Sequence, residues 1–256
     1  MDCVRSFLLV VGILVAAAPI CAQSAVRRPV TIAPFEPVRV QLPSPPNDSS
    51  FAAFRQTLAG VAQRRRFEEL ARYVRAQGFF WDGDFAKRFE PKRTGAENLA
   101  VALGLGDGSG IGWQMLADFA AEPTASARAS TPGVVCSPAK PNFDQEDFDS
   151  LIDATHFSRD NWVYPRAAGV ELRLAPHSES AVIETLGSYF VRVLRSVTAR
   201  ANADPLRTSW TRIAAPSGKI GYAAPDTLMS LSAARLCYTK DVTGRWSIAG
   251  FVGGAD

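Results

Sequence analysis

Val182-Ile-Glu-Thr-Leu186 and Tyr189-Phe-Val-Arg-Val-Leu194 are two short runs that are rich in β-branched and aromatic residues. Such runs predict β-strands. Three similar runs lie on either side of them: Val170-Glu-Leu-Arg-Leu174, Ser209-Trp-Thr-Arg-Ile-Ala214 and Lys219-Ile-Gly-Tyr-Ala223. The last two flank Pro216-Ser-Gly218, which is typical of a tight hairpin turn. Short strands at this spacing predict a small, strongly bent barrel.

The order of these runs resembles the bacterial SH3-like (SH3b) domain. That family has a Leu-x-Val-Arg-like strand, a Gly-Pro-rich turn, a Val-Ile-x-x-Leu strand, Trp-x-x-Val, a Gly turn and Gly-Trp-Val. The matching elements here are Val170-Glu-Leu-Arg173, Ala175-Pro176, Val182-Ile-Glu-Thr-Leu186, Trp210-Thr-Arg-Ile213, Ser217-Gly218 and Gly221-Tyr-Ala223. Ala175 replaces the usual Gly, Tyr222 replaces the usual Trp, and an insertion occupies 197–208.

The resemblance implies a binding module that contacts cell-wall peptides or partner proteins and carries no chemistry of its own. It places Trp210 and Tyr222 at the family's aromatic positions and Arg173 at the family's first-strand Arg. These three are the candidate binding residues. The alternative role for the two aromatic side chains is packing inside the barrel.

The segment after the barrel predicts one more hairpin. Its strands are Arg235–Asp241 and Arg245–Phe251, joined by the turn Val242-Thr-Gly244. The alternation of a strand puts Cys237 on the face opposite to Leu236 and Tyr238.

The first half of the chain is helical in pattern. Phe51, Phe54, Leu58 and Val61 follow one helical stripe, with Asp48, Ser49 or Ser50 as candidate N-caps. A second stripe, Phe67, Leu70 and Val74, points nearly the opposite way, which predicts a break at 63–66, an exposed corner at Arg64-Arg65-Arg66 and a helix end at Gly78. Further helices are expected at Trp113–Ala121 and Asp144–Thr155, the latter with Phe143 and Phe148 as a hydrophobic staple.

Phe79-Phe80-Trp81 is too much apolar surface to remain exposed. The run either fills the core between the helices or lines a hydrophobic ligand groove.

The fold class expected from all these patterns is α+β: a helical region at 48–157, an SH3-like barrel at 158–232 and a C-terminal hairpin at 233–256.

The N-terminus predicts export. Arg5 precedes an apolar run, Phe7–Ala18, and a small residue at Ala22, which together form a signal peptide at 1–22; cleavage after Ala25 is the second choice. The run is shorter than the roughly 18–20 residues that span a bilayer, so no stable membrane span is expected after cleavage. Residues 23–47 hold six prolines and predict an extended, solvated linker. We therefore expect a periplasmic or secreted protein.

Signal cleavage leaves two cysteines, Cys136 and Cys237. In an oxidising compartment such a pair predicts a disulfide, which would close a loop of about a hundred residues and stabilise the fold by roughly 4–5 kcal/mol. A bond between a helical-half cysteine and a hairpin cysteine would join the two halves into one unit. The alternatives are metal ligation and a thiol dyad with His156 or His177, but neither has a recognisable motif.

The chain has 28 Lys and Arg and 25 Asp and Glu, so its positive charge is nearly balanced. This balance argues against a protein that coats nucleic acid. We expect no cofactor and no metal. The sequence favours a non-enzymatic binding protein whose partner is a peptidoglycan peptide or an envelope protein. The alternatives are a structural or assembly protein with the barrel packed on the helices, and a cell-wall hydrolase whose site has no recognisable signature.

Overall fold

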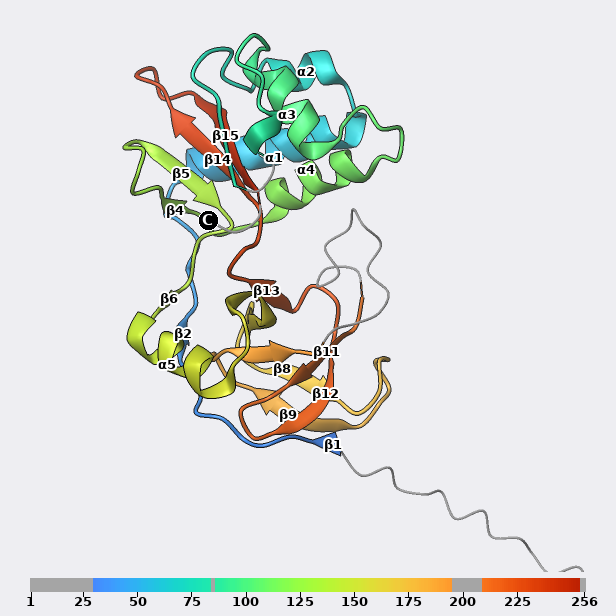
Figure 1. The fold of residues 1–256 in the computed structure, drawn as a ribbon. Coiled ribbons are helices and arrows are strands. Elements are labelled where there is room, and N and C mark those ends of the chain that lie inside the picture. The colour runs from blue at the N-terminus through green and yellow to red at the C-terminus, as the bar shows by residue number, and fades with distance from the viewer. Residues whose placement is uncertain (1–29, 84–85, 195–208, 254–256) are drawn as a thin grey trace, which may run out of the picture.

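The computed structural model describes residues 30–83, 86–194 and 209–253. These residues form two units, one above the other in Figure 1. The helical unit comprises 49–137 and 235–253, and the sheet unit comprises 30–43 and 141–231. The α+β class is confirmed. The expected signal peptide at 1–22 and the insertion at 197–208 lie outside the described residues.

The helical unit contains four helices on one face of a mixed sheet. The helices are α1 (Ser49–Arg64), α2 (Phe67–Ala71), α3 (Gly95–Leu103) and α4 (Ile111–Ala121), with a 3-10 turn η1 (Ala86–Arg88). The sheet runs in the order β3 (Phe80–Gly83), β15 (Trp246–Gly253), β14 (Arg235–Lys240), β5 (Val134–Ser137) and β4 (Ser126–Ala127). Only β3 and β15 pair in parallel among these strands.

The two faces of this sheet have different environments. Leu236, Tyr238 and Ile248 belong to the core that the helices cover. Cys136, Cys237 and the partly buried Phe80 pack on the other face. The expected alternation of Cys237 with its neighbours is therefore confirmed. Phe79 and Trp81 are each 6% exposed within the helix-covered core, so this run fills a core and does not line a groove.

The sheet unit is built on an antiparallel path of seven strands. In order these are β13 (Leu228–Ser230), β7 (Trp162–Pro165), β10 (Val191–Val193), β11 (Thr211–Ala214), β12 (Lys219–Ala223), β8 (Val170–Arg173) and β9 (Val182–Leu186); β1 (Val30–Thr31) also pairs with β12. The five strands expected from the sequence are all present. The expected closed barrel is not, because β13 and β9 end the path without pairing with each other among the described strands.

Local signals position the helices. Asp48 is the N-cap of α1 and accepts from the backbone N–H groups of Ser50 and Phe51, at 2.9 and 3.2 Å. The helix ends at Arg64, and Arg65 adopts a left-handed conformation (φ 53°), which confirms the corner. The next helix was expected to continue to Gly78, but α2 ends at Ala71. The reason is tertiary: the backbone of Tyr73 and Arg75 hydrogen-bonds to Ile248 in β15, at 2.7 and 3.0 Å.

The outer face of the larger sheet carries a separate core. Helix α5 (Gln145–Thr155), capped by Asp144 as expected, packs Phe148 and Leu151 against Trp162, Tyr164 and Phe190. The expected staple is also present, because the rings of Phe143 and Phe148 are 5.3 Å apart. This layer buries the second face of β7, whose four residues are all buried, whereas β8 alternates and leaves Glu171 exposed.

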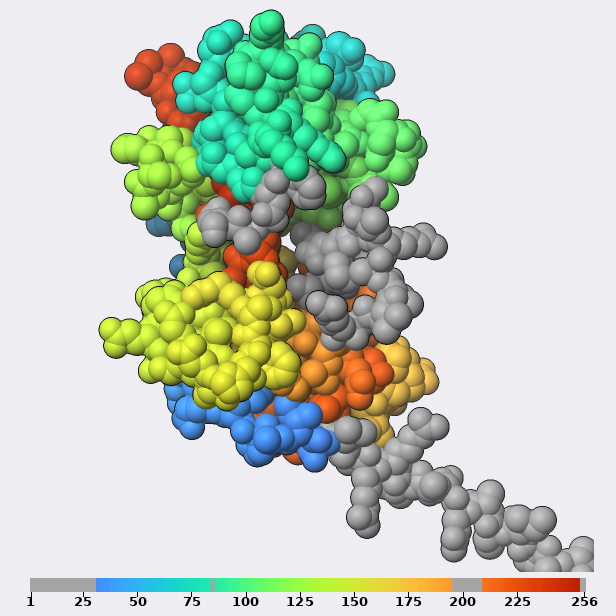
Figure 2. Space-filling model, viewed as in Figure 1, coloured from blue at the N-terminus to red at the C-terminus, as the bar shows by residue number. Residues whose placement is uncertain are grey.

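The proline-rich segment is extended, as expected, and most of its described part is exposed, including Pro34, Glu36 and Pro37. Figure 2 shows this segment in blue on the surface of the sheet unit, but two of its apolar residues are buried. Val38 and Val40 are 5% and 4% exposed, and Phe35 packs edge-on against Trp162 with ring centroids 5.1 Å apart. Backbone hydrogen bonds tie Val38 and Val40 to Phe190 and Ser188, and β2 (Val40–Gln41) pairs with β6 (Asn142–Phe143). The prolines exclude helix, but the apolar residues between them provide enough burial to dock the chain.

The chain order makes the main part of the sheet unit an insertion into the helical unit. The chain leaves the small sheet after Ser137 and re-enters it at Arg235 (Figure 1). The predicted disulfide lies at this point: Cys136 and Cys237 are register partners on β5 and β14 and are bonded. The expectation that the bond links the two halves is wrong, since both cysteines lie in one sheet. The bond instead joins the two ends of the insertion.

Candidate functional site

Two of the three sequence-predicted binding residues lie together. Tyr222 of β12 and Arg173 of β8 are register partners, so their side chains extend from the same face of the antiparallel pair. The guanidinium of Arg173 donates to the carbonyl oxygen of Ser180 at 2.6 Å and pairs with Glu171. Arg173 therefore secures the turn between β8 and β9, and only a fifth of its side chain is exposed.

Gly221 allows this close approach of β8 and β12. A Cβ at Gly221 would lie 2.6 Å from the carbonyl oxygen of Arg173 and 2.8 Å from the Cγ of Leu172. Any larger residue would therefore push the two strands apart. The glycine in the Gly221-Tyr-Ala223 motif thus has a packing role next to the predicted site.

Trp210 lies at the edge of this face. It directly precedes β11 and is half-buried. Thr211 and Ala223 are register partners with buried side chains, and Arg212 and Tyr222 are the next pair, on the opposite face. The face next to the predicted site thus carries Arg173, Arg212 and Tyr222, with Trp210 at the start of its strand.

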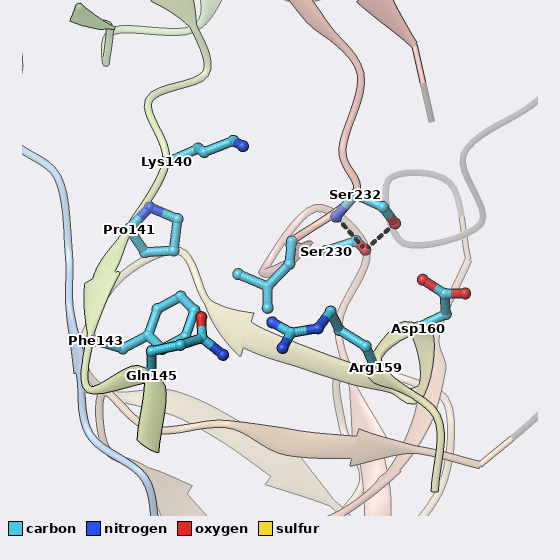
Figure 3. A pocket seen from close by; sticks show the side chains of 9 residues that line it. Lys140, Pro141, Phe143, Gln145, Arg159, Asp160, Ser230 and Ser232 are labelled. Carbon is cyan, nitrogen blue, oxygen red and sulfur yellow. Dashed lines mark hydrogen bonds between the residues drawn. The ribbon is translucent and has the colours of Figure 1, made fainter. Parts of the chain in front are cut away.

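A cavity of about 400 Å³ lies elsewhere, where two chain crossings between the units pass the sheet unit (Figure 3). Its lining combines three charged side chains, an amide, two hydroxyls and three apolar side chains: Lys140, Arg159, Asp160, Gln145, Ser230, Ser232, Pro141, Phe143 and Leu231. These residues come from the 140–145 segment, the 3-10 turn η2 (Arg159–Asn161), and the end of β13 with the two residues after it.

The apolar wall of this cavity is held firmly. The ring of Phe143 packs edge-on against both Phe148 and Phe190, with centroids 5.3 and 5.0 Å apart. Both partners are fully buried. Phe143 is therefore a fixed surface, because any rotation would open a void in the core beneath α5.

The polar lining is held less tightly. Arg159 donates from Nη2 to Asp149 at 2.8 Å and lies over the Phe148 ring at 4.8 Å. About half of each side chain in the Arg159–Asp149 pair is exposed, so solvent screens this ion pair. The hydroxyls of Ser230 and Ser232 are 2.8 Å apart, and the Ser232 N–H also bonds to the Ser230 hydroxyl at 3.1 Å.

A second cavity, of about 90 Å³, lies between the units and includes Glu122 and Arg166. Only 4% of the Glu122 side chain is exposed, and it pairs with Arg166 across the boundary. Glu122 also accepts from the backbone N–H and the hydroxyl of Thr124, at 3.0 and 2.6 Å. Burial raises the pKa of the nearby Tyr164 and Tyr238 hydroxyls, which remain neutral.

A third cavity, of about 550 Å³, separates the docked proline-rich segment from α5. It is lined by apolar residues, two carboxylates and two hydroxyls: Pro34, Phe35, Glu36, Pro37, Val38, Asp147, Ser150, Leu151, Ala154 and Thr155. No histidine lines any of these three cavities.

The residues considered for catalysis are placed as follows. Cys136 is fully buried in the disulfide, so the hypothesised thiol dyad with His156 or His177 is wrong. His156 is the left-handed C-cap of α5, and His177 lies in the turn after β8. Within the described ranges, His, Cys, Asp and Glu side chains form no group of three suited to a metal ion.

Sequence reasoning missed the cavity as a site and the Glu122–Arg166 pair. Phe143 and Gln145 belong to the predicted staple and its helix, but no motif marks them or the other residues as a site, because only the fold brings their segments together. Of the helices in the described ranges, none combines the length and the apolar character that crossing a bilayer requires.

Comparisons of the chain with protein-family models, with curated proteins and with solved structures gave no match.

Proposed function

We propose that this is an exported, non-enzymatic binding protein whose segment 158–232 is an SH3-like module. The observation that carries the proposal is the continuous antiparallel path β10-β11-β12-β8-β9, in which the four neighbouring strands β11, β12, β8 and β9 carry the sequence resemblance. These strands share one buried interior that includes Leu172, Leu186 and Ile213. The disulfide between Cys136 and Cys237 supports an oxidising compartment, periplasmic or extracellular.

The binding face in this proposal is the side of the sheet with Tyr222 and Arg173, bordered by Trp210. Tyrosine and tryptophan give large contact areas with a polar atom, and arginine recognises carboxylates with its planar fork. Because Arg173 already donates to the Ser180 carbonyl and pairs with Glu171, its contribution is to stabilise the conformation of this face. The aromatic side chains then provide the contact with a peptidoglycan peptide or an envelope protein.

The test is retention of the mature protein on purified peptidoglycan sacculi. We expect Tyr222→Ala and Trp210→Ala to lower the retained fraction at least severalfold with circular dichroism unchanged. The matched control is Trp246→Ala, which removes a partly buried tryptophan of the helical unit. Equal retention of all variants, or none for the wild type, would reject the wall-binding proposal.

The second candidate is a structural protein whose sheet unit only packs on other parts of the chain. The observation in its favour is that α5 and residues 35–42 already cover part of the large sheet. The contact considered from the sequence, between the module's aromatic face and Phe79–Trp81, does not support it, since Phe79 and Trp81 are buried in the core of the helical unit. Under this candidate, no surface variant changes sacculus retention.

A further inference from the structure

We propose that the cavity of Figure 3 binds the C-terminal carboxylate of a short peptide. The proposal concerns a second site and does not rest on the one above, because none of Arg173, Trp210 and Tyr222 lines this cavity. Its volume of about 400 Å³ is within the range of sites for small ligands. The end of a peptide fits such a space, whereas a folded partner surface does not.

Two cations enter the cavity from different segments. Figure 3 shows Lys140 on the crossing between β5 and β6, and Arg159 extending from η2 toward the space beside Phe143. Arginine has five N–H donors, and the bond to Asp149 uses one nitrogen, Nη2. Because that pair is half exposed and therefore weak, a ligand carboxylate can share the guanidinium.

The remaining lining fits the other groups of a peptide end. Gln145 offers both a donor and an acceptor for a backbone amide, and the Ser230 and Ser232 hydroxyls offer the same. The fixed ring of Phe143, with Pro141 and Leu231, forms an apolar surface for a small side chain. Polar groups at a few points on a rigid apolar wall are the usual composition of a specific small-ligand site.

The charge balance favours a carboxylate over a phosphate. Asp160 lines the cavity with Lys140 and Arg159, and Asp149 pairs with Arg159, so these two cations and two carboxylates balance. A carboxylate adds one negative charge beside Asp160 and Asp149, whereas a phosphate dianion adds two and is repelled more strongly. Asp160 can also accept an N–H of the bound peptide.

The place of the cavity in the chain gives binding a measurable effect on stability. Its lining joins the crossing segment that follows β5, the end of β13 with the residues after it, and η2 of the sheet unit. A ligand held by all three binds the folded state alone. Saturation therefore raises the midpoint of thermal unfolding, in proportion to the logarithm of ligand concentration above Kd.

The experiment is a calorimetric titration of the mature chain with N-acetyl-alanyl-alanine and with its C-terminal amide, each as the L,L and the D,D form. We expect one or both free acids to bind and the matching amide to bind at least about tenfold more weakly, because the amide lacks the charge-assisted hydrogen bonds. Arg159→Gln and Lys140→Gln should each weaken acid binding about fivefold or more, and Asp160→Asn should not weaken it. Lys87→Gln, at an exposed lysine of the helical unit, is the matched control.

Equal affinity for acid and amide, or no loss in either glutamine variant, overturns the proposal. Tighter binding of inorganic phosphate than of either acid also overturns it and assigns the cavity to phosphate. Arg159→Lys keeps the charge and should retain most of the affinity, which separates loss of charge from loss of folding. Sacculus retention lost with Tyr222→Ala but unchanged with Arg159→Gln distinguishes the two sites.

Discussion

Arg166, directly after β7, forms an ion pair with Glu122, the C-cap residue of α4. The pair connects the sheet unit to the helical unit, and Arg166 also lies 3.4 Å from Asp226. Glu122 is nearly inaccessible, whereas about a fifth of the Arg166 side chain reaches solvent. A buried carboxylate needs such a partner, because an unpaired charge in the interior is costly.

Removing the Arg166 guanidinium alone should therefore destabilise the folded protein. We expect Arg166→Met to lower the free energy of unfolding by about 3 kcal/mol, since it leaves the Glu122 carboxylate buried without its ion-pair partner. The double variant Glu122→Gln/Arg166→Met should lose clearly less than the sum of the two single losses. Urea unfolding of all four proteins measures the coupling, and additive losses would show that the pair does not act as a unit.

The disulfide prediction follows from its place at the ends of the insertion. Cys136 and Cys237 are separated by 101 positions, so the chain-entropy model gives up to about 4–5 kcal/mol. If the sheet unit stays folded when the helical unit unfolds, it already keeps the ends of the insertion close together. The free energy of unfolding that Cys136→Ala/Cys237→Ala loses is then smaller. Comparing denaturant midpoints of that variant and of the wild type, with and without reductant, measures the loss. Wild-type stability that is indifferent to complete reduction would contradict any stabilising role.

The lowered pKa of Asp48, the N-cap of α1, predicts that the stability of the fold depends on pH. Its hydrogen bond with Ser50, and then that with Lys240, lower the pKa of the carboxyl from 3.8 to about 2 in the folded protein. A carboxyl with a lowered folded pKa stabilises the fold above its unfolded pKa, and this contribution disappears as the pH falls through the folded value. We expect Asp48→Ala to be less stable than the wild type at pH 7, and the difference to shrink between pH 4 and pH 2.

The control for that effect is Asp48→Asn, which keeps a side-chain cap but has no carboxyl to titrate. Its stability should change less with pH than that of the wild type over the same interval. Thermal melts at several pH values compare the three proteins. A constant difference between wild type and Asp48→Ala down to pH 2 would contradict the assigned cause.

Gly221→Ala should destabilise the sheet unit by about 1–3 kcal/mol, the usual cost of overpacking. The added methyl would lie too close to the Arg173 carbonyl oxygen, at 2.6 Å. Gly106→Ala is the matched control, because nothing lies within 4 Å of a Cβ there. Chemical denaturation of both variants gives the comparison, and equal midpoints would show that β8 and β12 accommodate the methyl.

Much of the local structure follows from the sequence because its causes are local. Asp48 and Asp144 cap helices where the residue types predict caps, and the Phe143–Phe148 staple forms within a single turn of chain. The five strands and the C-terminal hairpin also appear where alternation and turn residues place them. The cysteine pairing was predictable too, since cleavage of the expected signal peptide would leave only two candidates.

The tertiary structure decided the rest, because the deciding contacts are distant in sequence. β15 holds 73–75 in an extended form where the periodicity favours a helix, and the core beside α5 buries Val38 and Val40 of a segment whose prolines suggest a solvated linker. The carboxyl of Glu122 and the lining of the cavity around Arg159 gain their neighbours from remote segments. Periodicity and propensity report a residue's immediate neighbours; which sheet a strand joins, and which surfaces then face each other, depends on packing over the whole chain.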